Sequence, residues 1–102
     1  NRKFAADMEG WSKLAKHLFV WDYTTNYNDY LGPHPNLRVL VPNVRYFVQH
    51  GAIGLFEEGE GDDFCELKNW LLMRVMWEPQ LEAEKLMDEF FRGYYGEAIA
   101  PL

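Results

Sequence analysis

Residues 17–27 read HLFVWDYTTNY, and this run decides the fold class. Its first half is apolar and too short for a typical helix, and its second half turns abruptly polar, which is typical of a buried parallel strand that ends in a site. Residues 52–59, AIGLFEEG, repeat the pattern and also reach carboxylates. Asp22 and Glu57 are about one strand–helix–strand unit apart. We therefore expect two neighbouring parallel strands whose acids meet at their carboxyl ends.

Amphipathic helices are expected around these strands. Apolar residues recur at helical spacing in four regions, residues 2–16, 37–50, 63–77 and 80–93. In the second region either the helix begins at Pro42 or residues 37–41 form a separate turn. Gly51 supplies a left-handed stop, and Asp63 with Glu66 resembles a capping box. The order helix, strand, helix, strand, helix, helix predicts an α/β fold with parallel strands and a right-handed crossover.

Two parallel strands make a poor fold by themselves, because parallel sheets are normally covered on both faces and contain more strands. We therefore expect residues 1–102 to be a single α/β segment of a larger (β/α)8 barrel of the TIM type. The chain starts with Asn1 rather than Met and reads as an excerpt of a longer polypeptide. The remainder of the barrel would be its partner, and open strand edges predict self-association of the fragment.

Composition excludes several classes of protein. With 48% hydrophobic and 17% aromatic residues, disorder is not expected, and some rings must line a ligand groove or pack against other polypeptide. The net charge of −6 and the lack of a Lys or Arg cluster argue against nucleic acid. No apolar run approaches the ~18 residues of a membrane span. The histidines lack zinc-like spacing and Cys65 has no partner cysteine, so neither a metal nor a cofactor is expected.

Asp22 and Glu57 are the candidate catalytic residues. Hydrolysis of a glycosidic bond uses two carboxyl groups, about 5 Å apart for retention and about 6.5–9.5 Å apart for inversion. Neighbouring strands are about 4.8 Å apart, so extended side chains can reach either separation. Acids at strand ends also serve as helix caps or simply face solvent. Strand alternation sends Glu57 and Glu58 to opposite sides, which leaves open which of them faces the barrel mouth.

The candidate substrate-binding residues lie beside these acids and in the loop that follows the first strand. Residues 24–36 are rich in Asn, Gly and Pro, and such strand-to-helix loops line ligand sites in barrels. Aromatic rings stack on sugar faces, although the same rings can instead be core or can pin the loop. The candidates are Trp21, Tyr23, Asn26, Tyr27, His34 and Glu58, with His34 in a rigid Pro-His-Pro segment.

Five ordered motifs carry a family resemblance over nearly the whole chain. They are VWDYTTN at residues 20–26, PHPNL at 33–37, GLFEEG at 54–59, WEP at 77–79 and FFRGYYG at 90–96. They resemble an uncharacterised bacterial domain family that occurs in multidomain secreted or periplasmic proteins. The barrels of that family are glycoside-hydrolase-like, related in layout to α-glucuronidases and hexosaminidases.

The resemblance implies the later part of a barrel catalytic domain that acts on an oligosaccharide or polysaccharide. In that family the place of Glu57 is typically acidic, the place of Glu58 is often Gln, and the place of Asp22 varies. These departures favour Glu57 as the functional acid. The alternatives are a noncatalytic glycan-binding or scaffolding domain, and a purely structural segment. The resemblance also implies that the full-length protein is secreted or periplasmic.

Overall fold

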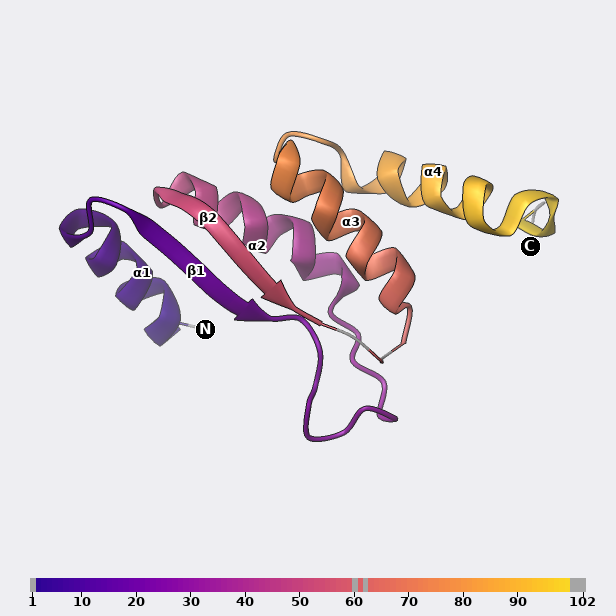
Figure 1. The fold of residues 1–102 in the computed structure, drawn as a ribbon, viewed down its shortest axis with the longest axis horizontal. Coiled ribbons are helices and arrows are strands. Elements are labelled where there is room, and N and C mark those ends of the chain that lie inside the picture. Colours follow the sequence, from indigo (N-terminus) through magenta and orange to yellow (C-terminus); the bar gives the residue numbers. More distant parts are fainter. Residues whose placement is uncertain (1, 60, 62, 100–102) are drawn as a thin grey trace.

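Four α-helices and two strands follow one another in residues 2–59, 61 and 63–99, the part of the chain that the computed structural model describes (Figure 1). The fold is therefore α/β, with the element order that the sequence predicts. The elements are α1 (Arg2–Leu14), β1 (Leu18–Tyr23), α2 (Leu37–Gln49), β2 (Ala52–Glu58), α3 (Cys65–Trp77), α4 (Ala83–Tyr95) and a short 3₁₀ helix (Gly96–Ile99).

The two strands pair in parallel, which confirms the central prediction from the sequence. Their register sets Trp21 opposite Phe56 and Asp22 opposite Glu57, after an irregularity between Leu18 and Phe19. Because register partners in a parallel pair point to the same side, the sheet has two well-defined faces. We call the face that carries Leu18, Val20, Asp22, Leu55 and Glu57 the covered face. The open face carries Phe19, Trp21, Tyr23, Phe56 and Glu58.

Both α1 and α2 pack on the covered face, behind the strands in Figure 1. Met8 of α1, Val20 of β1 and Phe47 of α2 are buried together in one apolar cluster. Val20 thus contacts the helices that precede and follow its own strand. Neither helix crosses to the open face, so the two helices and the strands form two layers.

A larger core joins α2, α3 and the start of α4. Its buried members are Leu40, Val41, Val44, Leu67, Leu71, Leu72, Val75 and Leu86, and Leu55 of β2 packs against it. Leu86 is the buried residue of α4. The rest of that helix extends away from the sheet toward the C-terminal end (Figure 1).

The structure corrects both interpretations of Pro42. The helix α2 begins at Leu37 and continues through Pro42 as one element. Pro42 has no N–H for the carbonyl of Arg38, but both residues lie on the exposed side, where water can satisfy that carbonyl. On the opposite side Leu40, Val41 and Val44 are buried, which holds the two parts in line. The left-handed stop at Gly51, with φ of 83°, is confirmed.

Boundaries of the three other predicted helices also shift. Asp63 does not cap α3, because the helix begins at Cys65 after Phe64, which has a left-handed φ of 56° and makes no side-chain cap hydrogen bond. The first helix ends at Leu14 rather than at residue 16. The last helix runs from Ala83 to Tyr95 rather than over residues 80–93, because the turn Glu78–Leu81 precedes it and Gly93 is tolerated inside it.

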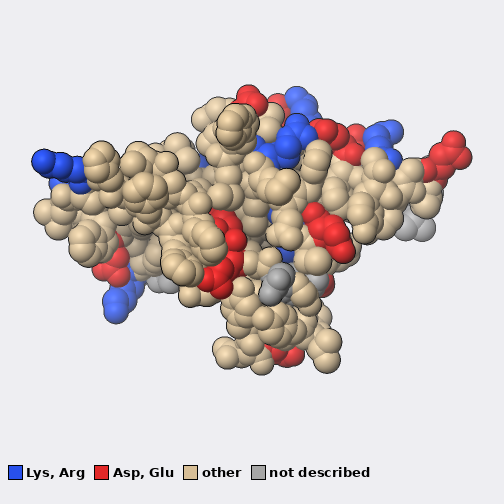
Figure 2. Space-filling model, viewed as in Figure 1, with Lys and Arg blue, Asp and Glu red and all other residues tan. Residues whose placement is uncertain are grey.

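The open face exposes several large rings. Trp21 is 65% exposed, and Phe19, Tyr23 and Phe56 are exposed as well. Figure 2 shows the surface over the strands as largely uncharged with an acidic patch at its centre, while basic side chains gather toward the edges of this view. Among the described residues no helix is both long and apolar enough to cross a membrane.

Candidate functional site

The carboxyl ends of β1 and β2 meet at one edge of the sheet, and both following loops leave from it. Tyr23 pairs with Glu58 as the last register pair. The backbone N–H of Thr24 donates to the carbonyl oxygen of Glu58 at 2.7 Å, and the Thr24 hydroxyl donates to the same oxygen at 3.0 Å. Thr24 is only 4% exposed. The ends of β1 and β2 are therefore hydrogen-bonded to each other beside Asp22, Glu57 and Glu58.

Glu58 is the acid that points to the open face. The indole Nε1–H of Trp21 donates to Oε1 of Glu58 at 2.6 Å, and the hydroxyl of Tyr27 donates to Oε2 at 3.1 Å. Both carboxylate oxygens are thus held by neutral donors, one from β1 and one from the loop. Among the described residues, none of the ion pairs involves Glu58.

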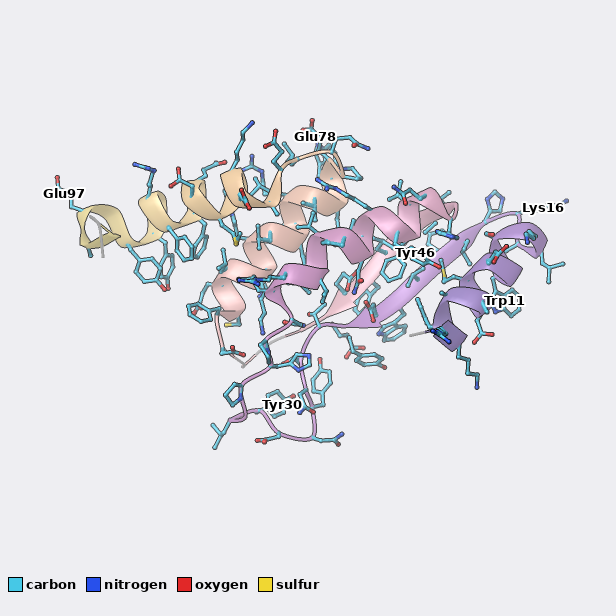
Figure 3. The ribbon with its side chains drawn as sticks, turned by 180° about the vertical axis from the view of Figure 1, so that it is seen from behind. Trp11, Lys16, Tyr30, Tyr46, Glu78 and Glu97 are labelled. Atoms are coloured by element: carbon cyan, nitrogen blue, oxygen red, sulfur yellow. The ribbon has the colours of Figure 1, made fainter. Side chains whose placement is uncertain are left out.

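Aromatic rings extend the site from Glu58 into the loop. Tyr27 makes edge contacts with Tyr23, at 5.9 Å between ring centroids, and with Tyr30, at 5.6 Å. On the sheet, the rings of Trp21 and Phe56 lie 4.9 Å apart. Tyr30 is labelled on the loop beside the sheet in Figure 3. These rings form two groups, Trp21 with Phe56 and Tyr27 with Tyr23 and Tyr30, which Glu58 connects through its hydrogen bonds, and we call this arrangement the Glu58 site.

Asp22 and Glu57 lie together on the covered face. Burial, with a further contribution from the negative charge of Asp22, raises the pKa of Glu57 from 4.5 to about 7. The Oε2 atom of Glu57 is buried and has no hydrogen-bond partner among the described residues. A carboxyl group with such a pKa can hold or release a proton near neutral pH, which is the property of a general acid or base.

A cavity of about 360 Å³ lies on the covered face between α1 and α2. Asp22 lines it, together with Phe4, Ala5, Asn43, Tyr46 and Phe47. The Tyr46 hydroxyl donates to the carbonyl oxygen of Ala5 at 3.4 Å and so bridges the two helices (Figure 3). The cavity therefore opens away from the Glu58 site, on the other side of the strands.

Lys68 of α3 anchors the loop that follows β1. Its side chain is only 4% exposed, and its Nζ donates to the carbonyl oxygen of His34 at 3.1 Å and contacts Oδ1 of Asp63 at 3.3 Å. The same oxygen accepts the backbone N–H of His34 at 3.1 Å. The hydrogen bond from His34, with a smaller contribution from Lys68, lowers the pKa of Asp63. His34 is held here through its backbone.

Other polar residues set the shape of this loop. Asn26 accepts the backbone N–H of Asn28 at 3.1 Å, which forms an Asx turn. Asn36 donates through its amide to the carbonyl oxygen of Thr24 at 2.6 Å, so the two ends of the loop are joined. Among the described residues, no group of three or more His, Cys, Asp or Glu side chains could hold a metal ion.

The comparison with family models decides the family. The model described as Domain of unknown function (DUF4838) matches residues 1–102. The chain belongs to the DUF4838 family. Comparisons with curated proteins and with solved structures give no significant match.

In this DUF4838 chain six of the eight predicted site residues separate into two groups, while Asn26 and the backbone of His34 shape the loop. Trp21, Tyr23, Tyr27 and Glu58 come together on the open face, whereas Asp22 and Glu57 come together on the covered face. The predicted meeting of Asp22 with Glu57 is found, with their side chains turned toward the helices.

Sequence reasoning missed Lys68 as a residue of this region. Its signal is present in the chain, because Lys68 stands at helical spacing with the buried Leu72 and Val75, on the apolar side of α3. A lysine in such a position must find polar partners inside the fold. The partners come from two loops that are far apart in the sequence.

Proposed function

We propose that this chain is an arc of a (β/α)8 barrel and that the Glu58 site is part of the glycan-binding mouth of that barrel. The layers of the fold support the barrel, and the chemistry of the Glu58 site supports glycan binding.

The arrangement of the layers supports the barrel. In a barrel all helices lie outside the sheet, so helices before and after a strand cover the same face, as α1 and α2 do at Val20. In a doubly wound sheet the second face is covered by helices from the other half of the sheet. In a barrel the open face would be the inner wall, where Phe19 would pack against side chains from other strands.

The position of Glu58 between Trp21 and Tyr27 is the observation that supports glycan binding. Sugars present flat C–H surfaces that stack on aromatic rings and hydroxyl groups that need hydrogen-bond acceptors. The Glu58 site offers both within one surface, and each carboxylate oxygen keeps a lone pair beyond the donor it already accepts. In this proposal Trp21 and Tyr23 stack on the sugar and Glu58 accepts its hydroxyls.

Hydrolysis would need a second carboxyl group on the same face as Glu58. Asp22 and Glu57 face the helices, so this partner would come from another strand of the barrel. In this proposal residues 1–102 supply the surface that binds the sugar and one acidic residue, Glu58. A second candidate is catalysis by Glu57, and the specific observation in its favour is the pKa of about 7. Catalysis by Glu57 requires that the substrate reach the covered face, or that the end of β2 turn so that Glu57 points to the open face.

A titration with a panel of neutral, acidic and amino oligosaccharides, followed by tryptophan fluorescence, tests the binding proposal. We expect the signal to disappear in Trp21→Phe and to persist in Trp77→Phe, a matched control because Trp77 is 90% exposed at the end of α3. Binding by no member of the panel, or a signal that follows Trp77, would refute the proposal.

Hydrolysis assays on the full-length protein separate the two candidate acids. If the Glu58 site acts in catalysis, Glu58→Gln abolishes turnover and Glu57→Gln retains it. The reverse result would favour Glu57. Turnover by neither the wild type nor the variants, with intact binding, would assign a noncatalytic glycan-binding role.

A further inference from the structure

The Glu58 site carries a negative charge that its surroundings do not neutralise. The groups that hold its oxygens are the indole of Trp21 and the phenol of Tyr27, which are neutral donors. None of the ion pairs among the described residues reaches Glu58. A ligand that brings a positive charge to this carboxylate would therefore replace no existing ion pair.

The rings around Glu58 favour the same sign of charge. The face of an aromatic ring attracts a cation because its quadrupole places negative charge above and below the ring plane. The Trp21 N–H and the Tyr27 hydroxyl that hold the carboxylate lie at the edges of their rings, so the exposed faces of these rings lie beside Glu58 and can meet a ligand. An ammonium group beside Glu58 could therefore pair with the carboxylate and also contact an aromatic face.

The charges outside the Glu58 site also favour a positively charged ligand. The Asp22 carboxyl lies at the same strand ends on the covered face, and the chain has a net charge of −6. A uronic acid or another anionic sugar would meet like charge here, because no Lys or Arg of the described residues pairs with Glu58.

We propose that the glycan bound at the Glu58 site carries an ammonium group, so that the ligand class is an amino sugar rather than a neutral or an acidic one. This inference rests on the proposed glycan-binding function. The ammonium group would contact Glu58 and the neighbouring rings, while the sugar ring stacks on Trp21. Three features of one site support the proposal: a carboxylate that no cation of the described residues pairs with, exposed aromatic rings beside it, and the Asp22 carboxyl on the other face of the same strand ends.

The test uses three tetrasaccharides that differ mainly in charge, measured by calorimetry at mildly acidic pH. They are the glucosamine tetramer, its N-acetylated form, which is neutral, and the galacturonic acid tetramer, which is anionic. We expect the glucosamine tetramer to bind at least about tenfold more tightly than the other two. Glu58→Gln should remove this preference, and Glu57→Gln, with its side chain on the opposite face, should keep it.

Different outcomes would overturn the amino-sugar inference and the proposed glycan binding. Equal binding of the glucosamine and N-acetylated tetramers, both lost in Trp21→Phe, would overturn the amino-sugar inference and leave glycan binding in place. Tighter binding of the anionic tetramer, or a preference that survives Glu58→Gln, would also overturn it. Binding of none of the three would overturn both proposals.

Choline serves as a further probe because it carries the positive charge without a sugar. We expect choline to bind far more weakly than the glucosamine tetramer, since it cannot stack a pyranose ring on Trp21. Choline binding as tight as that of the tetramer would show that the site recognises the ammonium group alone, and would overturn the assignment to an amino sugar.

Discussion

Replacing Glu57 by Gln tests the description of the covered face through the pH dependence of stability. The pKa of Glu57 is raised from 4.5 to about 7, chiefly by burial. The folded state therefore binds the proton more tightly than the unfolded state does. At pH values below 4.5 both states are protonated and no penalty exists. As the pH rises from 4.5 to 7, the unfolded state releases this proton while the folded state retains it, so the free energy of unfolding falls. Above pH 7 the folded protein holds a partly buried charge and the loss is complete.

The size of the effect follows from the two pKa values. A rise from 4.5 to about 7 corresponds to at most about 3 kcal/mol. Because Glu57 is only partly buried, solvent screens the charge, and we expect about 1–2 kcal/mol. Gln has nearly the same shape and no charge. Above pH 7 the Glu57→Gln variant should therefore be more stable than the wild type by about 1–2 kcal/mol, and below pH 4.5 the two should agree.

Urea unfolding followed by circular dichroism at a series of pH values measures this difference, with the slope m checked for constancy. Glu58→Gln is the matched control, because the neighbouring residue on the opposite face accepts hydrogen bonds from Trp21 and Tyr27. We expect it to gain no stability above pH 7. A Glu57→Gln variant whose difference from the wild type is the same at every pH would refute the reasoning.

Three further predictions concern the anchor of the loop, the core and the open face. Lys68→Met should lower the free energy of unfolding by about 1–3 kcal/mol, because the part-buried carbonyl oxygen of His34 loses the lysine that donates to it, and limited proteolysis should then cut within residues 24–36; unchanged stability and cleavage would contradict the anchoring role. Leu71→Ala should cost about 2–5 kcal/mol in urea unfolding, whereas Met73→Ala, on the exposed side of the same helix, should change stability by less than about 0.5 kcal/mol. The two-stranded sheet should self-associate through its open face, and light scattering should show a smaller particle for Trp21→Ser; a monomeric wild type would contradict this.

Local signals in the sequence were sufficient for most of the fold. The strands of six and seven residues, their direction and the stop at Gly51 follow from short apolar runs and from the conformational freedom of glycine. The predictions failed where a local rule competed with packing. Pro42 did not begin or break a helix, because burial on the opposite side of α2 outweighed one missing hydrogen bond. Asp63 did not cap α3, because Lys68 and the backbone of His34 bind its carboxylate.

The sequence by itself determined that Glu57 and Glu58 point to opposite sides of the sheet, because side chains alternate along any strand. It also determined that Asp22 and Glu57 could meet, because parallel strands one crossover apart align their ends. Which side the helices cover was decided only by the tertiary structure, through the packing of Met8 and Phe47 on Val20. That packing partly buries Glu57 beside Asp22 and leaves Glu58 among the aromatic rings. No local pattern could have predicted it, because the position of a helix layer depends on contacts between residues that are distant in the sequence.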